Sequence, residues 1–318
     1  MIGSKDERIK RDNNILLTKR KIIEFCLAES SNFLSVQKYQ LVVPAATQAL
    51  KFCRELDGDT SILLVEPYLQ LAQASFGLRR FKQCEEYLAL GQWIVLNVEE
   101  CADTTNSRLN QQLGRLCVVK GEFEKAKEYF SRSIYYSSRC YGAESISTSI
   151  GYFRLGDVFM ALGKTECCLA FFDKVVDIWY KYLSSLMSRF DNGSVDISPE
   201  NNNVAVLEQL SEETMSEGRG QLQSVFEKRR QVLGVNHIAT GEAQFTIGIF
   251  EFILLGNQSV AEELISTAFK IYIAQLGNEH PSTKHVSTIL SLFSQDVKSD
   301  LQQNSSQFVQ SEEFFSPE

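Results

Sequence analysis

One short phrase recurs along the chain at a fixed interval, and this repeat constrains the fold more than any other feature. Its copies begin 42 residues apart, at Gln37-Lys38-Tyr39, Arg79-Arg80-Phe81, Gly121-Glu122-Phe123 and Gly163-Lys164-Thr165. An apolar stretch of helical period precedes each copy, and a second one follows it. Each period therefore predicts a helix, a tight turn and a second helix. The first residue of each copy is termed its anchor.

Small residues recur at fixed distances from the anchors, where two helices of a pair must approach each other closely. The residues expected to pack in this way, or to form the turn, are Ala72, Gly114, Ala126, Gly156, Gly163 and Ala261. This pattern is typical of the tetratricopeptide repeat, here lengthened from 34 to 42 residues. HEAT and armadillo repeats have a similar length but lack the small residues beside the turn. The sequence predicts an all-α tetratricopeptide-repeat superhelix of about six antiparallel helix pairs, one of them degenerate.

The regular period is interrupted after the fourth anchor and returns at Gly256-Asn257. A polar stretch with turn residues accounts for the extra length, and the degenerate repeat is expected to contain a helix from Gln221 to Leu233. The predicted organisation is a charged lead-in over 1–18, four repeats over 19–186, an insertion loop over 187–203, the degenerate and last repeats over 204–293, and a disordered acidic tail over 294–318.

A second phrase joins one repeat to the next. It reads Leu233-Gly234-Val235-Asn236-His237 and again Leu276-Gly277-Asn278-Glu279-His280, with a weaker copy at Tyr141-Gly142. We expect each glycine to end a helix in the left-handed conformation. The two histidines are expected to make turn hydrogen bonds or simply to be exposed, rather than to serve in catalysis or metal binding.

Composition and motifs argue against several classes of function. The formal net charge of −8 and the isoelectric point near 5.2 disfavour a nucleic-acid-binding protein. No apolar run is long enough to predict a bilayer span, and the charged first residues do not resemble a signal peptide, so we expect an intracellular protein.

The eight cysteines form no C-x-x-C pair and are expected to be buried apolar residues. No nucleotide-binding or hydrolase motif is present, and the prediction is a non-enzymatic protein without metal or cofactor.

Stacked helix pairs form a concave surface lined by the first helix of each pair, and such surfaces bind proteins. The residues expected to point into this groove are Leu69, Gln73, Gln111, Arg115, Phe153 and Asp157. They lack the Lys and Asn side chains with which chaperone-binding repeat domains hold a terminal carboxylate, so a chaperone adaptor is disfavoured.

Several stretches resemble the zinc finger MYND domain-containing protein 12 family. They include Lys21 to Cys26, Glu66 to Leu78, Glu85 to Leu88 and Gly151-Tyr152-Phe153. The resemblance implies a non-enzymatic subunit of the ciliary or flagellar axoneme, located in the cytoplasm and cytoskeleton. It implies as partners a single-headed inner-arm dynein heavy chain and a second axonemal tetratricopeptide protein, with tubulin of the doublet microtubule as a further candidate. The chain departs from the family in one respect, because Cys26 is the only cysteine or histidine between Met1 and Gln40, so no zinc site can be carried over.

An alternative function is a cytoplasmic tetratricopeptide adaptor for motor cargo or for dynein-arm assembly, similar to kinesin light chain. The Leu-Gly-x-x-His-Pro linker that begins at Leu276 suggests it. Such an adaptor is expected to carry a coiled coil before its repeats, and the short charged stretch before the first repeat favours the axonemal subunit instead. The tail residues Phe308, Phe314 and Phe315 are candidates for a peptide motif that docks on a partner.

Overall fold

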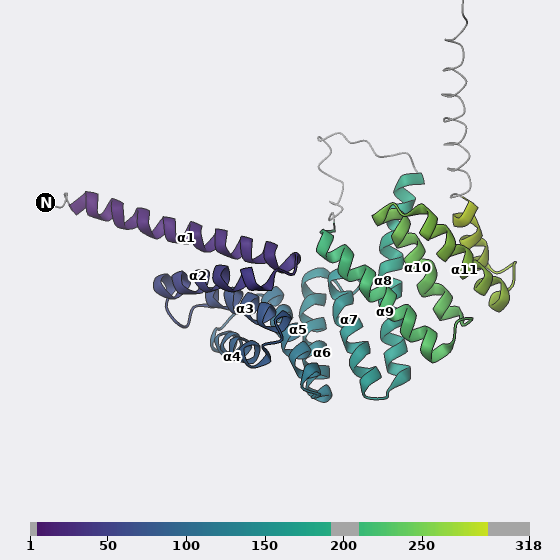
Figure 1. Cartoon of the computed structure of the whole chain (residues 1–318), viewed down its shortest axis with the longest axis horizontal. Coiled ribbons are helices and arrows are strands. Elements are labelled where there is room, and N and C mark those ends of the chain that lie inside the picture. The colour runs from purple at the N-terminus through teal and green to yellow at the C-terminus, as the bar shows by residue number, and fades with distance from the viewer. Residues whose placement is uncertain (1–4, 192–209, 292–318) are drawn as a thin grey trace, which may run out of the picture. The chain divides into compact units, whose positions relative to one another are not determined.

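The computed structural model describes residues 5–191 and 210–291, and within these ranges it contains helices and turns but no strand (Figure 1). In order along the chain the helices are α1 (Lys5–Ser35), α2 (Tyr39–Asp57), the short η1 (Ile62–Leu64), α3 (Val65–Gly77), α4 (Phe81–Asn97), α5 (Asp103–Val119), α6 (Phe123–Tyr141), α7 (Ile146–Ala161), α8 (Thr165–Asp191), α9 (Glu212–Leu233), α10 (Ile238–Leu255) and α11 (Gln258–Leu276). A further helical segment covers 281–291. The predicted all-α class is confirmed.

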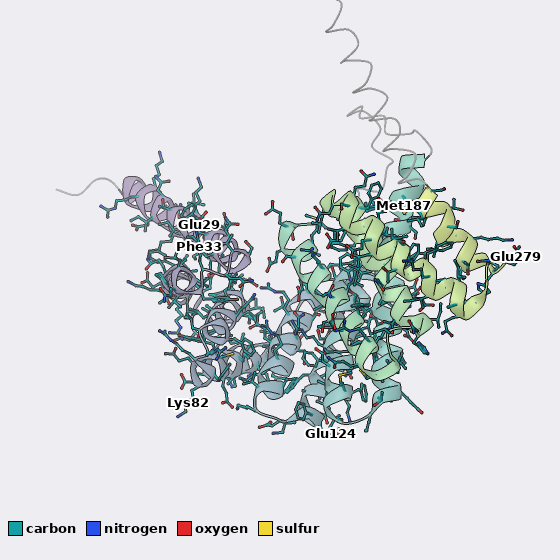
Figure 2. The ribbon with its side chains drawn as sticks, turned by 45° about the vertical axis from the view of Figure 1, so that its right-hand side comes forward. Glu29, Phe33, Lys82, Glu124, Met187 and Glu279 are labelled. Atoms are coloured by element: carbon teal, nitrogen blue, oxygen red, sulfur yellow. The ribbon has the colours of Figure 1, made fainter. Side chains whose placement is uncertain are left out.

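The chain divides into two compact units, Met1–Phe172 and Asp173–Glu318, and the boundary falls within α8. Unit 1 contains the pairs α1/α2, α3/α4 and α5/α6, followed by α7 and the start of α8. Unit 2 contains the rest of α8, then α9, the pair α10/α11 and the segment 281–291. In unit 1, Lys82 and Glu124 are the second residues of α4 and α6, and both lie along the lower edge of the ribbon in Figure 2. This edge is therefore the one at which the turns of two successive pairs lie.

Every anchor is the residue that reverses the chain between the two helices of its pair. The anchors are left-handed, with φ of 56° at Gln37, 58° at Arg79, 76° at Gly121, 70° at Gly163 and 67° at Gly256. The residue after the anchor donates its N–H back to the first helix, as Lys38 does to the Phe33 carbonyl at 2.8 Å. This hydrogen bond closes the Schellman turn that commonly ends a helix. The 42-residue period of the sequence is thus the period of these turns.

The joints between repeats have a different backbone from the one expected. Gly58, Gly142, Gly234 and Gly277 combine φ of 82° to 93° with ψ of 152° to 174°. The prediction of a left-handed conformation at Gly234 and Gly277 was therefore wrong in ψ, since these glycines occupy the extended region at positive φ that is almost closed to other residues.

Three residues after each of these glycines, a side chain caps the next helix by accepting a backbone N–H. The acceptor is a serine hydroxyl at Ser61 and Ser145 and the Nδ1 atom at His237 and His280, with distances of 3.1 to 3.3 Å. The two linker histidines therefore make the turn hydrogen bonds that the sequence predicts, and they stand in positions where serine is a preferred cap.

Small residues meet large rings where the helices of a pair cross. A Cβ atom built on Gly114 would lie 2.7 Å from Phe130 Cε1. Ala72, Ala126 and Ala261 are fully buried at 0 % exposure. The expected packing of the repeat residues is therefore what the structure shows, and no larger side chain fits these crossings without a shift.

The degenerate repeat differs from the expectation. Its helix α9 begins at Glu212 rather than at Gln221. Gly218, in the added turns, faces the buried ring of Trp179, which leaves no room for a Cβ atom at this position. α8 continues to Asp191, through the first residues of the predicted loop 187–203, and α1 begins at Lys5, within the predicted lead-in. The rest of that loop and the predicted tail lie outside the described residues.

The cysteines follow the prediction in part. Cys53, Cys84, Cys117 and Cys168 are buried, Cys26 and Cys101 are half-buried, and Cys140 and Cys167 are exposed. Burial raises the pKa of the Cys84 thiol to about 11, which keeps this group protonated and unreactive.

Among the described helices α10 alone is long and apolar enough to cross a membrane, but 61 % of it is buried inside the protein, as in the core helix of a folded unit.

Candidate protein-interaction site

Two of the six predicted groove residues are core residues. Leu69 is 1 % exposed and Phe153 is 6 % exposed, and the Phe153 ring lies 6.2 Å from the ring of Phe172 in the same helix pair. Side chains this deeply buried cannot be reached by a partner. Their assignment to the groove was wrong, because one face of each first helix packs against its own second helix.

The other four predicted residues, Gln73, Gln111, Arg115 and Asp157, are half-buried on α3, α5 and α7. The structure brings Gln73 and Arg115 together beside Phe76, where they line a narrow depression. The Arg115 guanidinium lies 4.5 Å from the centroid of the Phe76 ring. Gln111 and Asp157 do not line this depression, so the predicted residues do not form one continuous site.

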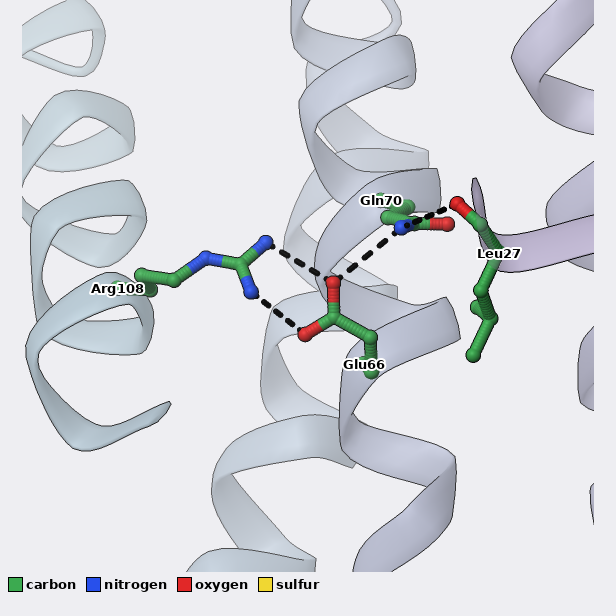
Figure 3. Close-up of polar contacts among 4 residues, drawn as sticks. All are labelled: Leu27, Glu66, Gln70 and Arg108. Atoms are coloured by element: carbon green, nitrogen blue, oxygen red, sulfur yellow. Dashed lines mark hydrogen bonds and ion pairs between the residues drawn. The ribbon is translucent and has the colours of Figure 1, made fainter. Parts of the chain in front are cut away.

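A row of polar contacts, not predicted from the sequence, joins the first helices of three successive pairs in unit 1 (Figure 3). Arg108 on α5 makes two hydrogen bonds to the Glu66 carboxylate on α3, at 2.6 and 3.0 Å. Gln70 on α3 donates to Glu66 and to the Leu27 carbonyl on α1, both at 3.2 Å. Glu66 and Arg108 are one period of 42 residues apart. The side chains of Glu66, Gln70 and Arg108 are hydrogen-bonded to one another. We therefore interpret them as contacts that stabilise the stack of helix pairs and not as a ligand-binding site.

Unit 2 contains a cleft with a volume of about 660 Å³. Pockets of about 300–1,000 Å³ are typical of binding sites. The cleft lies between α8, α10, α11 and the segment 281–291, and it is lined by Asp173, Val176, Asp177, Tyr180, Glu242, Phe245, Thr246, Tyr272, Pro281, Ser282, His285 and Val286. Nothing in the sequence analysis identified this cleft.

Four rings form the aromatic part of the cleft. The Phe245 centroid lies 6.1 Å from that of Tyr180, 6.3 Å from that of Tyr272 and 6.2 Å from that of His285. The Tyr180 hydroxyl and His285 Nε2 are hydrogen-bonded at 2.8 Å, which ties α8 to the segment 281–291. Phe245 and Tyr272 are 3 % and 6 % exposed, so the cleft has a fixed aromatic lining.

Three carboxylates line the same cleft, and one of them has no cationic partner. Asp177 is 3.0 Å from Lys181 Nζ, and Asp173 forms an ion pair with Arg229. Glu242 makes no hydrogen bond or ion pair through its carboxylate within the described residues. Desolvation by the protein around it raises the pKa of this carboxyl, although the charge of Arg229 acts in the opposite direction. Glu242 is nevertheless exposed to solvent, so its carboxylate is open to a cationic partner from outside the chain.

Arg229 on α9 lies beneath these carboxylates with a fully buried side chain. Its guanidinium donates to the Ala239 carbonyl at 2.6 Å and to the Asp173 carboxylate. Burial lowers the pKa of this guanidinium, and the Asp173 charge opposes the change. Arg229 thus joins α9 to α8 and to the start of α10, which fixes three elements around the cleft.

The cleft residues come from segments that are distant in the sequence, which is why a repeat pattern does not reveal them. The available signal is local. Asp173, Asp177 and Tyr180 share one face of α8 by their spacing of three and four residues, and Glu242 and Phe245 share a face of α10. No group of three metal-ligating side chains occurs within the described ranges, so these carboxylates are too far apart to make a metal centre.

Comparison with known proteins bears on the fold. A family model described as tetratricopeptide repeat matches residues 107–140, which cover most of α5 and α6. The fold is of the tetratricopeptide type. Repeats of this type present protein-interaction surfaces, so the chain is a protein-interaction scaffold in its architecture.

Similar curated proteins are the clustered mitochondria protein homologs of Emericella nidulans, Aspergillus niger and Aspergillus oryzae. Each is 23 % identical over 241 residues, which make up 73 % of this chain. The matched region is only 18 to 19 % of those proteins, so the chain spans less than a fifth of the length of these relatives.

Two solved structures are similar at low identity. One contains the nearly identical tetratricopeptide-like repeats of a Podosopora anserina protein described as a kinesin light chain, with 12 % identity, a TM-score of 0.42 and coverage of 79 % of this chain and 95 % of that one. The other is BtubC of P. vanneervenii, with 14 % identity, a TM-score of 0.34 and coverage of 81 % and 94 %.

The predicted location in a cilium or flagellum was wrong. The relatives found are named for clustered mitochondria and not for an axoneme. The resemblance that led to this expectation rests on short phrases such as Glu66 to Leu78. In the structure much of that phrase is buried core of α3, where any repeat protein of this type needs similar apolar residues.

Proposed function

We propose that this chain is a non-enzymatic cytoplasmic adaptor that binds a motor complex through one part of its repeats and a mitochondrial surface protein through another. The observation that carries the adaptor role is the open cleft of unit 2, because it combines a fixed aromatic lining with the unpaired carboxylate of Glu242. Glu242 is exposed to solvent, so a cationic group of a partner can reach this carboxylate.

The mitochondrial side of the proposal comes from the relatives, whose names refer to clustered mitochondria. The motor side comes from the sequence resemblance to the MYND protein 12 family, and membership of that family is part of this proposal. On the motor side the proposed partners are a dynein heavy chain and a second tetratricopeptide protein, with tubulin as a further candidate. The assembly proposed is a hetero-complex without nucleic acid and without a membrane span.

The test is co-purification of partners with the tagged full chain, from cytosol and from a mitochondria-enriched fraction, with the tag alone as control. We expect dynein subunits and mitochondrial outer-surface proteins to be enriched by the chain, and we expect mitochondria to cluster in cells that lack it. A normal mitochondrial distribution, together with the absence of motor subunits from both fractions, would contradict the proposal.

A further inference from the structure

We propose that the cleft of unit 2 binds an arginine side chain in a basic segment of a partner protein, with its guanidinium held by Glu242 and Asp177 against the aromatic lining. The inference rests on the proposed function, since it gives the class of partner segment that the scaffold binds. It starts from the cleft residues and their charges rather than from the repeat type.

The sign of the charge in the cleft decides the class of ligand. Asp173, Asp177 and Glu242 line it, and none of the lining residues is lysine or arginine. Asp173 is already paired with the buried Arg229 and Asp177 with Lys181. The carboxylate of Glu242 has no such partner within the described residues. A cationic group from another protein could therefore form an ion pair with it.

A second unpartnered group points to the same ligand. Tyr272 is 6 % exposed and lines the cleft, and its hydroxyl makes no hydrogen bond within the part of the chain that the structure describes. Burial and the nearby charge of Glu242 raise the pKa of Tyr272, so this hydroxyl stays protonated. The Tyr272 hydroxyl and the exposed Glu242 carboxylate both lack a hydrogen-bond partner within the described residues, so both oxygens can accept hydrogen bonds from a donor outside the chain.

The aromatic rings favour arginine over lysine. A guanidinium is planar, stacks on aromatic faces and donates to a carboxylate through two parallel hydrogen bonds. The cleft offers the half-buried ring of Tyr180 next to carboxylates, and the Arg115 guanidinium beside Phe76 in unit 1 shows the same kind of contact within this chain at 4.5 Å. A single metal ion is a poorer occupant, since the described residues hold no group of three potential ligands.

The chain's own tail is excluded as the occupant by charge. Residues 296–318 contain five acidic residues and one lysine, so this segment would be repelled by the unpaired carboxylate of Glu242. A basic segment of another protein is the occupant that complements the cleft. A peptide copy of residues 296–318 then serves as a negative control.

The experiment measures binding of a fluorescein-labelled peptide to the full chain by fluorescence anisotropy. The peptide carries two arginines, one residue apart, in a glycine and serine background, and a matched peptide carries citrulline in place of both. Citrulline has the shape of arginine without the charge. We expect the arginine peptide to bind about tenfold or more tightly than the citrulline peptide, and the tail peptide not to bind.

Three variants locate the contact. Glu242→Gln and Asp177→Asn should each weaken binding of the arginine peptide about tenfold. Glu262→Gln removes the same charge from an exposed position of α11 that does not line the cleft, and it should bind as the wild type does. Thermal melts of all three proteins establish that they are folded.

Equal affinity of the wild type and Glu242→Gln, equal binding of the arginine and citrulline peptides, or tighter binding of the acidic tail peptide would each overturn the inference. The proposed function is tested separately. If partners co-purify equally well with the wild type and with Glu242→Gln, the scaffold function stands and the cleft is not its binding site.

Discussion

Gly156 on α7 lies so close to Phe172 on α8 that a Cβ atom built on the glycine would stand 2.6 Å from Phe172 Cε1. The Phe172 ring is itself fully buried and cannot move aside without disturbing the pair. This contact is the reason why the small residue recurs seven positions before an anchor. It also makes the crossing of α7 and α8 a sensitive point for stability.

Substitution of Gly156 by leucine should lower the free energy of unfolding by roughly 1–3 kcal/mol, because it overpacks the crossing. Urea denaturation measures the change. The matched control is Gly220→Ala, since Gly220 lies within α9 with no atom within 4 Å of a built Cβ. Alanine there should stabilise the protein by about 0.5–1 kcal/mol through helix propensity. Unchanged stability of Gly156→Leu would mean that the helix register is different.

Arg79 should be replaceable by glycine with a gain in stability. This anchor has a φ of 58°, and a left-handed conformation costs a residue with a Cβ atom roughly 1–2 kcal/mol. The equivalent anchors Gly121 and Gly163 avoid this cost. We expect Arg79→Gly to raise the midpoint of urea denaturation, and Gly163→Ala to lower it. The opposite order of the two midpoints would contradict the assigned turn geometry.

Arg229 should be necessary for the folding of unit 2. Arg229→Ala removes a buried side chain and leaves the Ala239 carbonyl without its donor, which should cost about 2–5 kcal/mol. The neighbouring residue Arg230 is a surface residue paired with Glu227, so Arg230→Ala should change stability by less than about 0.5 kcal/mol. Calorimetry or urea denaturation of both variants separates these outcomes. Equal effects of the two substitutions on the free energy of unfolding would show that the buried contacts of Arg229 do not stabilise the protein.

The stability of the chain should depend on the ionisation of Glu242. Desolvation holds its folded pKa above that of an unfolded glutamate, with the charges of Arg229, Asp173 and His237 as further influences. The folded state therefore binds the proton more tightly, and this contribution to stability is present at low pH and lost as the pH rises from about 4.3 through the folded pKa.

Glu242→Gln, which is neutral at every pH, should remove this dependence. Its melting temperature should exceed that of the wild type at pH 7, and the difference should shrink toward pH 4. The exposed Glu262→Gln serves again as control and should show a difference that does not vary in this way. A constant offset between wild type and Glu242→Gln across this range would argue against a raised pKa in the folded state.

The positions of the turns were predictable because they follow a strict period. Gln37 and Arg79 do not look like turn residues in isolation, yet their register with Gly121 and Gly163 identifies them, and all four are left-handed. The period reflects a geometric requirement of stacked pairs and holds even where the residue type is unfavourable.

The direction of individual side chains was less predictable. Gln111 and Phe153 occupy equivalent positions one period apart, but Phe153 is buried against Phe172 while Gln111 is only half-buried. The difference depends on the size of the neighbouring side chains in each pair, which the repeat period does not indicate.

The cleft was not predicted for a further reason. Glu242 and Tyr272 face residues of α8 across the interrupted part of the repeat, where no spacing relates one segment to the other.

The four joints at Gly58, Gly142, Gly234 and Gly277 have nearly the same backbone and the same capping arrangement. They act as interchangeable connectors. A chain cut at Gly58 and rejoined at Gly142 would lose two periods and still contain the same connector at the seam. Natural or engineered variants of this protein can therefore differ in length by whole repeats, while insertions of other lengths would have to be accommodated outside the joints.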